Sequence, residues 1–296
     1  MRFMVLVKSS AQSEAGVMPD EKMLSEMGKY NEELIRTGAL LAADGLQPSS
    51  KGARVRLAQG KVRNIDGPFA EAKELVGGYW ILQFPSYEQA LATLERAPFP
   101  TGEIEIRPLY EPEDFPLDVS EQPGGWRDQE VAARAEAAQG APPARIPGTR
   151  RYLSFLKADK YTEAGGPATP ELLAEMGGLM EEMMKAGVML SGDGLKPSRE
   201  GKRIVFEGEK RTVIDGPFAE TKELIAGVCL MQTRTLAEAL EWSRRMLEIH
   251  TRGVGLSDGE CEVRALHELE DFPVGAKEKP DGWRAQEQSF RDRTGQ

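Results

Sequence analysis

The stretch IDGPFAEAKEL at residues 65–75 returns as IDGPFAETKEL at residues 214–224. The same spacing of 149 residues, measured from Asp66 to Asp215, relates residues 2–83 to residues 151–232 without a gap. A long match at constant spacing is the signature of an internal duplication. The chain is therefore expected to contain two copies of one fold rather than two unlike domains.

The two copies differ near their ends. The spacing grows from 149 to 157 residues, because the Glu-Asp-Phe-Pro sequence at residues 113–116 matches residues 270–273. The second copy therefore carries eight extra residues, in the region that contains His250. Each copy is followed by an arm with a tryptophan, Trp126 or Trp283. We expect a first repeat with its arm at residues 1–130, an Ala- and Pro-rich linker at residues 131–149, and a second repeat with its arm at residues 150–296.

Strand and helix patterns alternate within each copy. In the first copy, apolar alternation predicts strands at residues 3–8, 39–43, 79–84 and 103–109, and a hairpin at residues 54–65. Helices are expected at residues 20–37, where Asp20 is a candidate N-cap, and at residues 87–96. Such a split β-α-β unit leaves one face of its sheet open, and two units packed face to face bury it. The predicted fold class is α+β, with two ferredoxin-like repeats forming an intramolecular dimeric α+β barrel.

Composition and charge restrict the kinds of partner that we expect the protein to bind. Of the 296 residues, 48 are Asp or Glu and 38 are Lys or Arg, which gives a formal charge of −10. An acidic chain argues against a nucleic-acid partner and against an anionic membrane surface. No stretch reaches the ~20 apolar residues of a membrane span, and the N-terminal residues lack the pattern of a signal peptide. We expect a cytoplasmic protein.

The sequence contains no pattern for a bound cofactor or metal. Neither a P-loop nor the Gly-rich dinucleotide fingerprint is present. Zinc needs three or four convergent ligands, and the chain has only two histidines and two cysteines, all in its second half. We expect neither a bound cofactor nor a bound metal.

Four aspartates and one histidine are the candidates for catalysis. Asp66 and Asp215 open the repeated turn, where a carboxylate either accepts backbone N–H bonds and fixes the turn or faces a cleft as a base. Asp44 and Asp193 precede a Gly-Leu turn, and the same two roles are open to them. If Asp44 and Asp66 converge, one of them would have a raised pKa and act as a general acid or base. His250, which has no counterpart in the first copy, is the candidate for chemistry in one of two unequal pockets.

Charged side chains near the repeated turn are candidates for ligand binding. Alternatively, these residues form a solvated face or local ion pairs. Two arginines at matching hairpin positions would favour a ligand with a carboxylate. The candidates are Glu71, Lys73, Glu220, Lys222, Arg54 and Arg203.

The Asp-Gly-Pro-Phe-Ala-Glu motif at residues 66–71 and 215–220 resembles the DGPF proteins of the YCII-related family. The resemblance covers residues 2–115 and 151–272. It implies a dimeric α+β barrel similar to muconolactone isomerase, and enzymatic roles, including a dehydrochlorinase, for a few relatives. Enzyme-like members carry a His near the start of the first helix, paired with an Asp. Neither residues 20–37 nor residues 169–186 contain a His.

Two classes of function therefore stay open, and with them the question whether the protein is an enzyme. The first is binding or transforming a small molecule, by lyase- or isomerase-type carboxylate acid–base chemistry, in a cavity near the DGPF turns. The second is a non-catalytic protein-interaction or regulatory module. A pseudo-dimer within one chain is expected in either case, and a further homodimer is left open.

Overall fold

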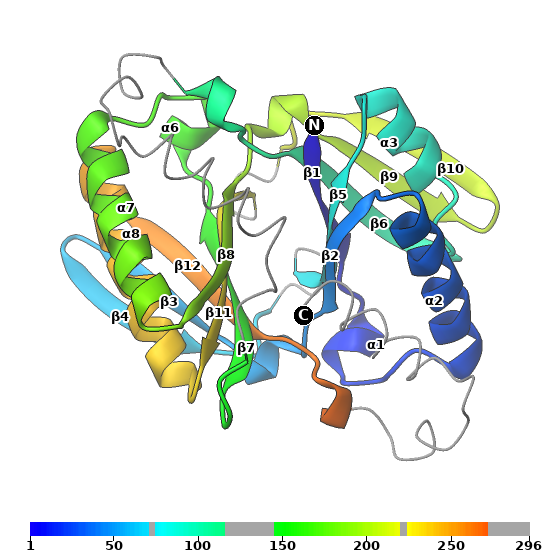
Figure 1. Cartoon of the computed structure of the whole chain (residues 1–296), viewed down its shortest axis with the longest axis horizontal. Coiled ribbons are helices and arrows are strands. Elements are labelled where there is room, and N and C mark those ends of the chain that lie inside the picture. Colours follow the sequence, from blue (N-terminus) through cyan, green and yellow to red (C-terminus); the bar gives the residue numbers. More distant parts are fainter. Residues whose placement is uncertain (71–74, 116–144, 220–223, 272–296) are drawn as a thin grey trace.

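The computed structural model describes residues 1–70, 75–115, 145–219 and 224–271 (Figure 1). The first repeat contains β1 (Arg2–Lys8), α1 (Ala11–Glu14), α2 (Glu21–Arg36), β2 (Leu40–Gly45), β3 (Ala53–Ala58), β4 (Lys61–Asp66), β5 (Val76–Gln83), α3 (Tyr87–Leu94) and β6 (Thr101–Pro108). The second repeat contains β7 (Arg150–Lys157), α6 (Lys160–Glu163), α7 (Pro170–Lys185), β8 (Met189–Gly194), β9 (Lys202–Glu207), β10 (Lys210–Asp215), β11 (Ile225–Thr233), α8 (Leu236–Gly253) and β12 (Gly259–Ala265).

The two repeats exchange their hairpins. One antiparallel sheet has the order β10-β9-β6-β1-β5-β2, and the other has the order β4-β3-β12-β7-β11-β8. The hairpin β3–β4 of the first repeat therefore extends the sheet of the second repeat, and β9–β10 extends the sheet of the first. Figure 1 shows the light-blue β3–β4 hairpin beside the orange β12, on the far side of the molecule from the rest of the blue half. The sequence does not indicate this exchange, because the strand pattern is the same wherever the hairpin pairs.

The predicted α+β class of two ferredoxin-like repeats is confirmed, with the sheets facing each other and helices on the outer faces. The layer between the sheets is apolar and includes Leu6, Phe155 and Leu230. The exchanged hairpins place Phe206 of the second repeat in the core under α2 and α3, and Val55 of the first in the core under α7 and α8. Each helix-covered core therefore contains side chains from both repeats.

The helices begin as the sequence predicts. Asp20 caps α2 by accepting a hydrogen bond from the Met23 backbone N–H, and Thr169 caps α7 by accepting one from Leu172. The short helix α1 lies where a loop was expected. The eight extra residues lengthen a helix, since α8 has 18 residues where α3 has 8.

The DGPF turn packs backbone against backbone. The Gly67 N–H donates to the Gly52 carbonyl, and the Phe69 N–H donates to the Ser49 hydroxyl. A Cβ on Gly67 would lie 1.9 Å from the Ser49 carbonyl oxygen, and one on Gly216 would lie 1.8 Å from that of Ser198. The glycine of the motif is therefore required by close approach of the chain in both repeats.

We expect Gly67→Ala to lower the free energy of unfolding by about 3 kcal/mol, because the Ser49 backbone would have to move to admit the methyl group. Gly178→Ala is the matched control, because Gly178 lies in α7 with no atom within 4 Å of its Cβ position. The control should raise stability by up to about 1 kcal/mol, since alanine favours the helix. Chemical unfolding followed by circular dichroism measures both. Equal stabilities of the two variants would contradict the role of the turn.

Candidate functional site

The aspartates of the DGPF motif lie at the surface. Asp66 ends β4 and is exposed, while the Asp215 side chain is 76% exposed and forms an ion pair with Lys202. Asp44 lies in the other sheet from Asp66 and is buried. The four charged candidates Glu71, Lys73, Glu220 and Lys222 lie outside the described residues, as do the arms with Trp126 and Trp283.

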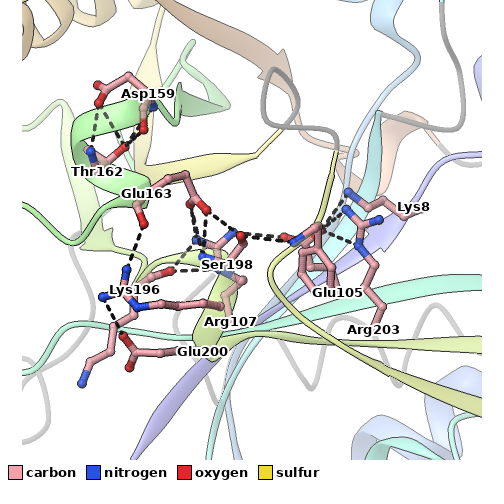
Figure 2. Close-up of polar contacts among 12 residues, drawn as sticks. Lys8, Glu105, Arg107, Asp159, Thr162, Glu163, Lys196, Ser198, Glu200 and Arg203 are labelled. Atoms are coloured by element: carbon pink, nitrogen blue, oxygen red, sulfur yellow. Dashed lines mark hydrogen bonds and ion pairs between the residues drawn. The ribbon is translucent and has the colours of Figure 1, made fainter.

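The two hairpin arginines bind carboxylates of the opposite repeat. Arg203 contacts Glu105 with 3.0 Å between Nη2 and Oε2, and Lys8 and Arg107 approach the same carboxylate at 3.2 and 3.1 Å (Figure 2). The guanidinium of Arg203 also covers the ring of Phe218 in its own DGPF motif, 4.0 Å from the ring centroid. The Arg203 guanidinium therefore contacts both a carboxylate and an aromatic ring.

The second cluster repeats the arrangement by pseudo-symmetry. Arg54 lies 2.8 Å from the Glu262 carboxylate, which Lys157 and Arg264 also approach, at 3.6 and 3.1 Å. Arg54 covers the Phe69 ring at 4.1 Å. The phenylalanine of each DGPF motif therefore supports the arginine that joins its hairpin to the other repeat.

The neighbouring lysine and arginine side chains lower the pKa of the two buried carboxylates. Burial by itself raises the pKa of Glu105, but Lys8, Arg107 and Arg203 outweigh it and lower the pKa to about 2. The pKa of Glu262 is lowered against burial in the same way by Lys157, Arg54 and Arg264. Both carboxylates are therefore charged partners of their clusters.

Asp44 and Asp193 occupy equivalent ion pairs across the two repeats. Arg151 donates from Nη1 and Nη2 to the two carboxylate oxygens of Asp44, at 3.0 and 2.9 Å, and its other contacts are to Glu268. Arg2 donates to Asp193 at 2.7 Å and is shared with Glu111. The Asp44 pair is fully buried, whereas the Arg2 side chain is 20% exposed.

His250 forms a pair with an acid in the second repeat. Its Nε2 lies 2.9 Å from Oδ2 of Asp159, the residue that caps α6 through the backbone N–H groups of Tyr161 and Thr162. Burial raises the pKa of Asp159, but the bonds from His250 and the cap outweigh this effect and lower it. His250 therefore joins α8 to the start of α6.

A cavity of about 300 Å³ lies between α2, the α1–α2 loop and the ends of β2 and β5. Its walls are mainly apolar and aromatic, with Leu24, Met27, Ile35, Trp80 and Phe99 among the lining residues. Its polar side chains include Asn31, Glu32, Asp44, Tyr79 and His267. Neither Asp66 nor Asp215 lines it.

Hydrogen bonds fix several polar residues of this cavity. The Tyr79 hydroxyl donates to Asp44 at 3.3 Å, and the Trp80 indole N–H donates to the Asn31 side-chain oxygen at 3.0 Å. The second repeat supplies His267, whose backbone N–H donates to the Gly45 carbonyl at 2.8 Å. Its ring lies over Gly45, where Cδ2 is 3.4 Å from the position of a Cβ. The cavity is therefore built from both repeats.

The equivalent place in the second repeat has different side chains. By the spacing of the duplication, Asn31, Tyr79 and Trp80 correspond to Met180, Val228 and Cys229, and His267 corresponds to Tyr110. A Cβ on Gly192 would meet the methyl groups of Met189 and Met180 at 2.7 and 3.8 Å. The Tyr110 ring closes on Gly194, 3.2 Å from its Cβ position. Methionine and tyrosine side chains thus occupy this place.

Sequence analysis selected Asp44 but missed the other polar groups of the cavity. Tyr79, Trp80, Asn31 and His267 are spread over the chain, and each looks by itself like an ordinary core or loop residue. The available signal is the mismatch between the copies, because each of the four positions holds an unlike residue in the other copy.

Two general features bear on cofactors and membranes. Over the described ranges, no three side chains of His, Cys, Asp or Glu are arranged to hold a metal ion. Burial raises the pKa of both cysteine thiols, Cys229 and Cys261, to about 12. No helix in the described part of the chain combines the length and hydrophobicity needed to cross a membrane.

Fold and site together define a duplicated α+β protein with unequal halves. Residues 1–113 and 151–254 each match the YCII-related domain. The chain belongs to the YCII-related family, and it carries the domain twice.

An uncharacterized protein of Rhizobium meliloti (strain 1021) is 31% identical over 102 residues, which are 33% of this chain and 82% of that protein. That relative therefore has about the length of one repeat. The crystal structure of a putative chlorite dismutase has 9% identity and a TM-score of 0.32, and the match covers 90% of this chain and 94% of that one.

The buried Glu105 cluster predicts a pH dependence of stability. Because the pKa of Glu105 falls from 4.5 to about 2 on folding, its contribution is complete above pH 4.5 and is lost as the pH falls toward 2. We expect Glu105→Gln to lower the free energy of unfolding at neutral pH by about 3 kcal/mol, because three cations lose their partner. The difference from the native protein should shrink as the pH falls through this window.

Urea unfolding at a series of pH values measures this difference. Glu207→Gln is the control, because Glu207 lies on the exchanged hairpin that carries Arg203 but pairs with Lys210 at the surface. Its effect should stay within about 0.5 kcal/mol at every pH. A Glu105→Gln curve parallel to that of the native protein would show that the cluster does not set the pH dependence.

Proposed function

We propose that the first-repeat cavity binds a small, mainly apolar molecule, and that its polar end carries out acid–base chemistry of the lyase or isomerase type on that molecule. The observation that carries the proposal is the cavity of about 300 Å³ with aromatic walls, which Asp44, Tyr79 and His267 also line. Ligand sites are commonly concave and apolar, with a few convergent polar groups. The proposal moves the site from the DGPF turns to the face of α2.

The polar end divides into an anchor and a proton carrier. Asp44 is fixed by two bonds from Arg151 and accepts a third from the Tyr79 hydroxyl. It therefore orients Tyr79 and supplies negative charge. His267 lies beside this group on a separate segment, and imidazole exchanges protons near neutral pH. His267 is the residue that we assign to proton transfer, with Tyr79 beside it as a hydrogen-bonding group.

The other sequence candidates receive structural roles in this proposal. Asp66 and Asp215 lie at exposed strand ends outside the cavity, so the proposal gives them no part in binding. Arg54 and Arg203 join the exchanged hairpins to the opposite sheets through Glu262 and Glu105. His250 fastens α8 to Asp159.

The site is expected to bind one ligand per chain. The probe is 1-naphthylmethanol, a neutral bicyclic alcohol, titrated by calorimetry. Asn31→Met installs the residue of the second repeat, fills the cavity and removes the acceptor of the Trp80 indole, so affinity should fall about tenfold or more. The mirror-image control Met180→Asn should leave the affinity unchanged. Two equivalents per chain, or an equal loss in both variants, would place binding elsewhere.

The role of His267 is tested by the pH dependence of the same titration. A neutral ligand laid over a charged imidazolium strips it of water, so affinity should fall by about threefold or more as His267 becomes protonated. His267→Gln should abolish this dependence, whereas His250→Gln, which alters the only other histidine of the chain, should preserve it. The assignment fails if the dependence survives in His267→Gln.

A further inference from the structure

We infer that the first-repeat cavity selects an uncharged or cationic molecule with one or two aromatic rings, and excludes carboxylates and phosphates. The inference rests on the proposed function and adds the chemical class of the ligand. It follows from the charges on the cavity wall, from the partners of the nearest cations, and from the shape of the wall.

The described part of the cavity wall has acidic side chains but no lysine or arginine. None of the described residues that line the cavity is a lysine or an arginine, whereas Glu32 and Asp44 both line it. Glu32 lies on the exposed side of α2, and Asp44 is buried at the opposite end. An anionic ligand would therefore meet the Glu32 carboxylate and lose its hydration without gaining a lysine or arginine as its partner.

Two guanidinium groups next to lining residues of the cavity are already bound to carboxylates. Arg151, which reaches the polar end of the cavity, divides its donors between Asp44 and Glu268. Arg264, next to the α1–α2 loop, contacts Glu14 and Glu262. Binding a ligand anion at one of these arginines would break a buried ion pair. The carboxylate of that pair would then stay buried without a charged partner, which costs free energy. These arginines do not form an anion site.

The shape of the wall fits flat rings. The Trp80 and Phe99 rings pack with their centroids 5.9 Å apart and tilted by 59°, and both line the cavity. Gly77 and Gly78 line the cavity without side chains. A cavity of about 150 Å³ holds one benzene ring. The volume of about 300 Å³ therefore accommodates one or two rings with a short substituent.

Glu32 gives the preference for a cation. A ligand whose rings lie on Trp80 can direct a short substituent toward the exposed side of α2, where the Glu32 carboxylate lies. An ammonium group there gains a charged partner and keeps contact with water. An aromatic amine should accordingly bind at least as tightly as the neutral compound of the same size.

Three probes with one ring system test the inference: 1-naphthylmethanol, 1-naphthylmethylamine and 1-naphthoate. Calorimetry on the full chain at neutral pH should show that the alcohol and the amine bind, and that the carboxylate binds about tenfold or more weakly than the alcohol. In Glu32→Gln, the affinity for the amine should fall about threefold or more while that for the alcohol is unchanged. Glu33→Gln, on the next residue of α2, is the matched control and should change neither.

The outcomes separate the inference from the function on which it rests. Binding of the carboxylate as tight as that of the alcohol would overturn the charge selection and leave the cavity as a ligand site. Loss of amine affinity in Glu33→Gln but not in Glu32→Gln would overturn the role of Glu32. If none of the three probes binds, both the ligand class and the proposed function are wrong.

Discussion

The structure depends on two buried carboxylates, Glu105 and Glu262, each of which collects cations from both repeats. Lys8 and Arg107 of the first repeat and Arg203 of the second surround Glu105, and the pseudo-symmetric set surrounds Glu262. A buried carboxylate without these partners would be costly, so each sheet needs the hairpin of the other repeat to satisfy its own charge. The exchange of hairpins and the burial of charge are therefore one constraint. It joins the two copies into one body, in place of two domains connected by a linker.

This joining explains how one copy obtains residues from the other. The bridges Leu46–Leu266 and Leu109–Leu195 bring the end of each repeat against the β2 or β8 end of its partner. The first repeat thereby receives His267 and the second receives Tyr110. After the duplication, these two positions and those of Asn31 and Trp80 carry different residues, and the two equivalent places differ in what fills them. A duplicated chain can vary one copy in this way, whereas a symmetric homodimer changes both sites at once.

Much of the fold could be predicted from local patterns, but little of the site could. The spacing of apolar residues predicted α2, and the alternation along residues 3–8 predicted β1, because these elements bury one face wherever they pack. Asp44 was recognisable as a carboxylate at a turn, but its partners Arg151 and Tyr79 come from β7 and β5. From the sequence, Arg54 and Arg203 were equally consistent with exposed hairpin positions. No residue near them in the sequence indicates that Glu262 or Glu105 is the ion-pair partner. Contacts between distant segments of the chain leave no local pattern.

The sequence by itself determined the duplication, most elements of each copy and the insertion that distinguishes the second copy. These features follow from spacing, periodicity and capping, which act over a few residues. Only the tertiary structure decided which sheet each hairpin joins, since a strand presents the same alternation to either sheet. It also decided that the DGPF aspartates lie at the surface and that the cavity lies beside α2. Burial and charge pairing depend on segments more than 100 residues apart, such as Asp44 and Arg151.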